Sequence, residues 1–147
     1  MPALHDLGIA EAAAAIRMGD ITAERLADAL LARVAANTDL NAFITVEPDR
    51  VREAARQADR RRVSEGSAGP LDGVPLALKD NIDTAGLPTT AGTPGLADNR
   101  PKRDAVIVQK LLAAGAIVLG KCNLQELAYG VTNKQRRVRT GPQSLRT

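Results

Sequence analysis

The chain has 147 residues, 44% of them hydrophobic, which suits one folded domain with a real core and excludes a disordered chain. It has one phenylalanine, one tyrosine and no tryptophan, so it lacks the stacking platforms of many single-strand nucleic-acid binders. Of its 20 basic residues, five lie in residues 134–147, which leaves 15 basic against 17 acidic residues elsewhere. The net charge of +3 therefore comes from the tail, and nucleic-acid binding would rest on that tail alone.

The sparse cysteine and histidine content narrows the chemistry further. Cys122 is the single cysteine, which excludes an intramolecular disulfide and favours a reducing, cytoplasmic location. His5 is the single histidine and lies near the N-terminus, so we expect neither a Ser–His–Asp triad nor a metal site. There is no phosphate-binding glycine motif and no apolar run as long as a membrane span, so we expect no cofactor and no membrane partner.

The first 63 residues are predicted to be mainly helical. Helices are expected at about 8–18, 23–36 and 48–63, with a short strand at 42–46. Thr22 can cap the second helix, whose predicted buried stripe is Leu26, Leu30 and Val34. The third helix begins at a proline, which suits the first turn of a helix.

The rest of the chain predicts a strand, a helix and a second strand. An apolar strand is expected at 73–78, followed by a long glycine- and proline-rich loop over about 80–103. A helix is expected at 105–114, with Val108, Leu111 and Leu112 buried, then a strand at 116–119 covered on both faces. A short helix should follow at 123–127. Strand, helix, strand in this order predicts a parallel pair and an α/β fold.

Lys79 is the strongest candidate for chemistry. It ends the apolar run and directly precedes Asp80 and Asn81, at the carboxyl end of a strand, where α/β proteins place their reactive groups. Burial disfavours the charged ammonium, so a lysine in such a place can serve as a proton acceptor. Most strand-end lysines are simply exposed, but the neighbouring long loop favours a functional role here.

Several motifs together resemble the amidase signature family. They are the segment Gly69 to Asp83, the segment Gly86 to Gly92, the stretch from Asp104 to Ala116, and the segments Leu119 to Asn123 and Glu126 to Gly130. The resemblance is dense from about residue 69 to residue 133. It implies a large mixed sheet layered with helices, of which residues 1–133 would be the truncated N-terminal part, and a Ser–cis-Ser–Lys triad that hydrolyses a carboxylic amide. Lys79 matches the lysine of that triad.

The resemblance does not supply the two serines. In the family they follow much later in a Gly-Ser-Ser-Gly-Gly segment, whereas this sequence has only Ser64, Ser67 and Ser144. We therefore expect the 147 residues alone to be inactive, although the family's substrate is a small-molecule amide. Two alternatives remain open: the amidase subunit of a tRNA-dependent amidotransferase, and a non-catalytic module that binds nucleic acid through its tail.

Residues 134–147 depart from the family pattern and form a separate basic tail. Read one base out of frame, their codons can encode a continuation that resembles the family. The sequence is thus interpreted either as a translated frameshift or as a genuine basic tail, and the coding DNA decides between the two.

Overall fold

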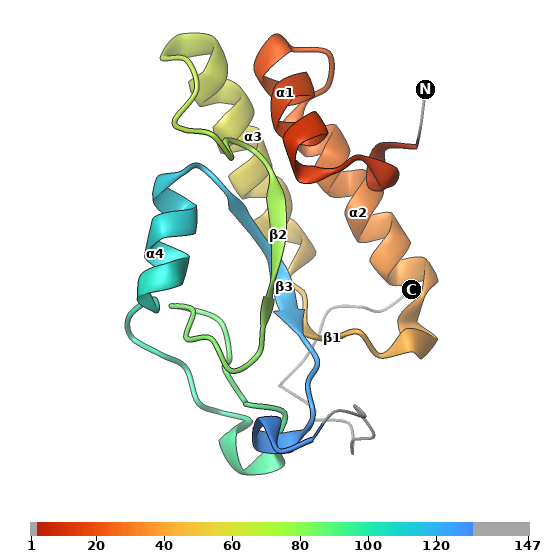
Figure 1. Ribbon diagram of the computed structural model, residues 1–147, viewed down its shortest axis with the longest axis vertical. Coiled ribbons are helices and arrows are strands. Elements are labelled where there is room, and N and C mark those ends of the chain that lie inside the picture. Colours follow the sequence, from red (N-terminus) through yellow and green to blue (C-terminus); the bar gives the residue numbers. More distant parts are fainter. Residues whose placement is uncertain (1–2, 131–147) are drawn as a thin grey trace. The chain divides into compact units, whose positions relative to one another are not determined.

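In the computed structural model, residues 3–130 are described, and they form four α-helices and a three-stranded sheet (Figure 1). The basic tail and its frameshift interpretation lie outside the described residues. The helices and strands are α1 (Ile9–Met18), α2 (Ala23–Ala36), β1 (Phe43–Thr45), α3 (Pro48–Ser64), β2 (Pro75–Lys79), α4 (Val106–Ala113) and β3 (Ile117–Cys122). Short 3₁₀ turns are η1 (Leu4–Asp6), η2 (Thr38–Leu40), η3 (Pro94–Leu96) and η4 (Glu126–Ala128).

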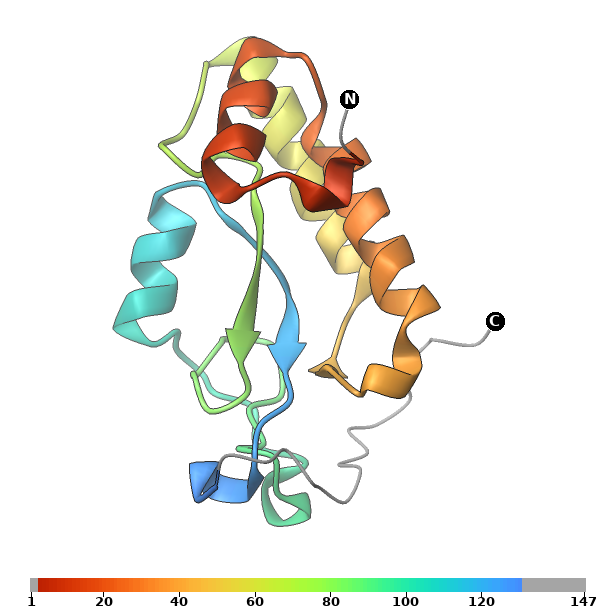
Figure 2. The same ribbon diagram turned by 45° about the vertical axis from the view of Figure 1, so that its right-hand side comes forward.

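The sheet is mixed, with strand order β1-β3-β2. β1 is antiparallel to β3, with Phe43 opposite Cys122. β2 and β3 run in the same direction, as the predicted strand–helix–strand order required (Figure 2). The amide of Ile117 donates to Val74 at the start of the pair, and the amide of Asp80 donates to Cys122 at its end. The ends of β2 and β3 therefore lie at one edge of the sheet.

The described chain divides into two compact units. The first contains residues 3–38, 48–76 and 110–119, and the second contains residues 39–47, 77–109 and 120–130. β2 and β3 each begin in the first unit and end in the second. The predicted domain boundary at residue 133 stays a prediction.

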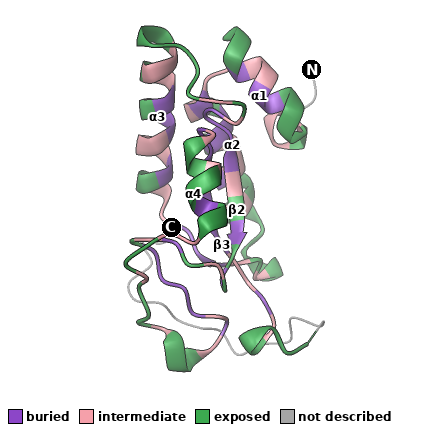
Figure 3. Cartoon of the chain, turned by 60° about the vertical axis from the view of Figure 1, so that its left-hand side comes forward, coloured by how far each residue is buried: buried purple, intermediate pink, exposed green. Residues whose placement is uncertain are grey.

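In the first unit, the start of α2 is held by a side-chain cap and by a carboxylate of α3. Thr22 caps α2 as predicted, accepting from the amide of Arg25 at 3.1 Å. The carboxylate of Asp59, on α3, accepts from the amides of Ala23 and Glu24 at 2.8 and 3.0 Å, so it holds the positive end of α2. α3 is buried on one face only, through Val51, Ala55 and Ala58 (Figure 3).

The predicted burial of α2 needs correction. Its buried residues are Ala23, Leu26, Ala27 and Leu31, whereas Leu30 and Val34 are only half-buried. Because α2 packs partly through small alanines, its buried stripe includes Ala27 and Leu31, each next in the helix to the predicted positions 26 and 30.

α4 departs from its predicted burial in the same way. Val108 is fully buried and Leu111 is half-buried, but the exposed fraction of Leu112 is 42%. Gly115 follows the helix with φ of +91°, and a Cβ there would lie 2.6 Å from the Cα of Asp72. That close approach requires glycine and brings the end of α4 against the turn that precedes β2.

Candidate active site

Lys79 lies at the carboxyl end of β2, as the sequence predicted, and it belongs to the second unit. Its environment differs from the expected one, because the Lys79 side chain is exposed and makes no hydrogen bond or ion pair with the described residues. The reason is the period of the strand: Leu78 points into the core, and Ala77 and Lys79 point to the open face. Lys79 is therefore not in the apolar setting that the sequence suggested.

The backbone around Lys79 is closely held. Its carbonyl accepts from the amide of Ile82 at 3.0 Å, and the carbonyl of Asp80 accepts from the amide of Ala91 at 3.0 Å. The amide of Leu127 donates in turn to the carbonyl of Ala91 at 2.8 Å. These hydrogen bonds bring Ala91, in the middle of the long loop, next to Asp80 at the start of the loop, and they connect η4 to Ala91.

The loop is an ordered structure with its own hydrogen bonds, although it has little regular secondary structure. Thr89 and Asn99 are paired twice, since the amide of Thr89 donates to the Asn99 carbonyl and the Asn99 side-chain amide donates to the Thr89 carbonyl. Asp104 accepts from the amide of Ala85 at 2.7 Å. These contacts give the predicted functional loop a defined shape beside Lys79.

Lys121, on β3, is a second lysine at this edge of the sheet and is completely buried. Its Nζ donates to the carbonyl of Ile82 and to Oγ1 of Thr89, both at 2.8 Å, and lies 3.4 Å from the carbonyl of Pro88. Oδ1 of Asp80 lies 3.5 Å away, which is an ion pair at a length beyond a strong hydrogen bond. Burial lowers the pKa of Lys121, and the Asp80 carboxylate opposes that shift.

Asp80 is the buried partner of this lysine. Its Oδ2 accepts from the backbone amide of Thr90 at 2.9 Å and from the Thr90 hydroxyl at 2.5 Å. Its Oδ1 has no hydrogen-bond donor among the described residues, so it depends on the charge of Lys121. Removing Lys121 would leave this oxygen buried without any compensation.

Lys121 is not among the candidate residues predicted from the sequence. The available signal was its position, because it follows an apolar run toward the end of β3 just as Lys79 ends β2. The strand was predicted to end at residue 119, three residues too early, and this concealed the parallel. The predicted helix at 123–127 is also shorter than expected and is confined to η4.

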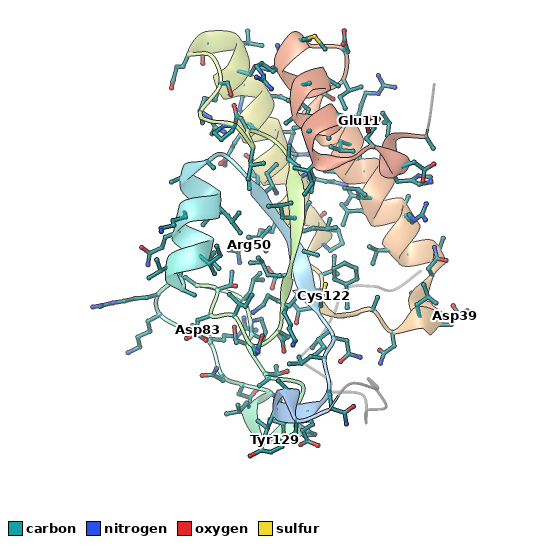
Figure 4. All side chains as sticks on the ribbon, viewed as in Figure 1. Glu11, Asp39, Arg50, Asp83, Cys122 and Tyr129 are labelled. Carbon is teal, nitrogen blue, oxygen red and sulfur yellow. The ribbon has the colours of Figure 1, made fainter. Side chains whose placement is uncertain are left out.

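The remaining candidate groups are placed as follows. Cys122 is half-buried at the end of β3, and burial raises the pKa of its thiol (Figure 4). Ser64 and Ser67 are exposed and donate to nearby backbone carbonyls, at the end of α3 and in the turn after it. Ser144 lies outside the described residues. Tyr129 is 92% exposed on the segment after η4.

Residues 3–130 contain neither a candidate metal site nor a candidate membrane-spanning helix. No three His, Cys, Asp or Glu side chains are grouped closely enough to hold a metal ion. No helix in this range is both long and apolar enough to cross a bilayer.

The described residues form a mixed sheet with helices, a lysine at a strand end and an ordered loop beside it, which is an α/β fold. The sequence profile of the Amidase family matches residues 25–142, and the chain belongs to this family. The match extends beyond Asn133, where the sequence analysis placed the end of the resemblance. The predicted α/β fold and amidase-signature family are confirmed.

Curated relatives include both amidotransferase subunits and a hydrolase. One subunit of the glutamyl-tRNA(Gln) amidotransferase of Chloroflexus aurantiacus is 46% identical over 145 residues, which is 97% of this chain and 30% of that protein. Mandelamide hydrolase of Pseudomonas putida is 43% identical over 129 residues, which is 88% of this chain and 25% of that protein. The chain thus spans about 30% or less of the length of these relatives.

Solved structures give the same assignment. The native peptide amidase of Stenotrophomonas maltophilia is 40% identical with a TM-score of 0.77, covering 82% of this chain and 25% of that one. This similarity in sequence and fold supports the same family as the curated relatives.

Proposed function

We propose that this chain provides the general base, Lys79, of an amidase active site that hydrolyses a small carboxylic amide in the cytoplasm. The observation that carries the proposal is the position of Lys79, at the carboxyl end of β2 beside an ordered loop. The Lys79 amine would accept a proton from a serine hydroxyl, which would then attack the amide carbonyl. The exposed face of β2 leaves the Lys79 side chain accessible to such a hydroxyl.

The serines would come from polypeptide outside these 147 residues. Ser64 and Ser67 donate to neighbouring backbone carbonyls in the first unit, and neither matches the family's serine motif. We therefore expect the purified 147-residue chain to release no ammonia from simple amides. Turnover by the chain that disappears in Lys79→Ala would contradict this expectation.

A hybrid enzyme tests the role of Lys79. The matching segment of the Pseudomonas putida mandelamide hydrolase is replaced by residues of this chain, and ammonia release from mandelamide is measured. Lys79→Ala should abolish turnover, while Lys102→Ala, at another exposed lysine of the second unit, should leave it intact. A hybrid that stays active with Lys79→Ala would rule out the proposed base.

A role as one subunit of an amidotransferase is the second candidate function. It is favoured by the 46% identity to the Chloroflexus aurantiacus amidotransferase protein, which extends over 97% of this chain. The same replacement in that protein provides the comparison. A hybrid that retains the amidotransferase reaction while the mandelamide hybrid fails would favour this candidate, in which the chain works beside partner subunits.

A further inference from the structure

Lys121 and Asp80 form a fully buried charged pair whose contacts all lie within the second unit. Few folded proteins bury a lysine completely, because removing the ammonium from water costs several kcal/mol unless it is paired and hydrogen-bonded. Here Nζ has two acceptors at 2.8 Å, and its remaining hydrogen faces the Pro88 carbonyl and the Asp80 carboxylate. The buried ammonium of Lys121 is thus compensated by hydrogen-bond acceptors and by an opposite charge.

The contacts of Lys121 join two separate points of the loop that begins after Lys79. At the start of the loop Nζ binds the carbonyl of Ile82, whose own amide donates to the Lys79 carbonyl. Further along the loop it binds the hydroxyl of Thr89, next to Thr90, which donates to Asp80. One ammonium therefore joins both points of the loop to β3.

We propose that Lys121 is a positioning residue for Lys79: its ammonium holds the Asp80 side chain and the Ile82 carbonyl, and so fixes the turn that presents Lys79. The inference rests on the proposed function of Lys79 as the base. Lys121 is buried and does not itself reach the open face of β2. It acts through the backbone of residues 79–82.

The experiment uses isotope-labelled 147-residue chain and three variants. Lys121→Met removes the charge and keeps most of the stem, while the double variant Asp80→Asn with Lys121→Met removes both buried charges. Lys110→Met, at an exposed lysine on α4, is the matched control. Amide hydrogen exchange is measured for Ile82 and Ala91, with Asn123 as an internal reference because its amide donates to Ala42 within the same unit.

The double variant separates positioning from overall folding. Without an unpaired buried charge it should melt with the same cooperativity as the parent. The amides of Ile82 and Ala91 should nevertheless exchange at least about tenfold faster relative to Asn123, and the Lys79 amide resonance should broaden or split. Lys110→Met should change none of these.

Three results would overturn the proposal. The first is an unchanged exchange rate of Ile82 and Ala91 in the double variant, which would show that the pair does not hold the turn. The others are an equal acceleration at Asn123 and the loss of cooperative melting in both Lys121 variants, since each would assign the pair to general folding. Lys79→Ala should leave the exchange pattern as it is in the parent. Failure of the hybrid assay would therefore remove Lys79 as the base without altering the exchange result, and the two proposals fail separately.

Discussion

Nζ of Lys121 and Oδ1 of Asp80 lie 3.5 Å apart, and both side chains are completely buried. Lys121 lies on β3, and Asp80 directly follows Lys79, the last residue of the neighbouring strand β2. A charged pair in this place links the stability of the loop to the geometry of the candidate base.

Lys121→Met should destabilise the chain by about 3–5 kcal/mol, because it leaves the Asp80 carboxylate buried without its counter-charge. Urea unfolding followed by circular dichroism measures this, since the chain has no tryptophan to report by fluorescence. Adding Asp80→Asn should recover a large part of the loss. A single variant within about 0.5 kcal/mol of the parent, as expected for Lys110→Met, would show that the pair contributes little.

Gly120→Ala should be destabilising by about 1–3 kcal/mol through overpacking. A Cβ at this position would lie 2.6 Å from the backbone oxygen of Thr45, so β1 would have to move away from β3. Gly95→Ala is the control, because its Cβ would meet its nearest neighbour at 3.7 Å. Equal unfolding free energies for the two variants would argue against the close β1–β3 contact.

Cys122 should react slowly with a disulfide reagent in the folded chain. Burial raises the pKa of its thiol, so near pH 8 less of it is the reactive thiolate than in unfolded chain. The rate of absorbance increase with Ellman's reagent, measured with and without urea, gives the ratio of the reaction rates in the unfolded and the folded chain. Each rate reports on the single cysteine. A folded chain that reacts as fast as the unfolded one would contradict the burial of this thiol.

Glu53 should contribute a pH-dependent part of the stability. Hydrogen bonds from Arg56, Gln57 and Arg60 lower its pKa below the ordinary value of 4.5, so the folded state favours the carboxylate. Its contribution should be fully present above pH 4.5 and be lost as the pH falls through the lowered pKa. Thermal melts of Glu53→Gln and parent should therefore differ at pH 7 and converge in acid. A difference that grows in acid would have the wrong sign.

Local sequence signals predicted much of the fold. Thr22 capped its helix as expected, and the strand–helix–strand order predicted the parallel pair. The contacts of the buried Lys121 could not be predicted in this way, because its partners Ile82 and Thr89 lie 39 and 32 residues away in the chain. The exposure of Lys79 could not be predicted from the apolar run before it, because Leu78 points into the core whereas Ala77 and Lys79 point to the open face.

The role of Lys79 is tested most directly by kcat for mandelamide in the hybrid enzyme, compared between Lys79→Ala and Lys102→Ala. A general base contributes about 10²–10⁴-fold, so kcat should fall by at least about a hundredfold for the first variant and stay near the parent value for the second. A fall of less than about threefold for Lys79→Ala, in a hybrid that hydrolyses mandelamide, would contradict the assignment of Lys79 as the base.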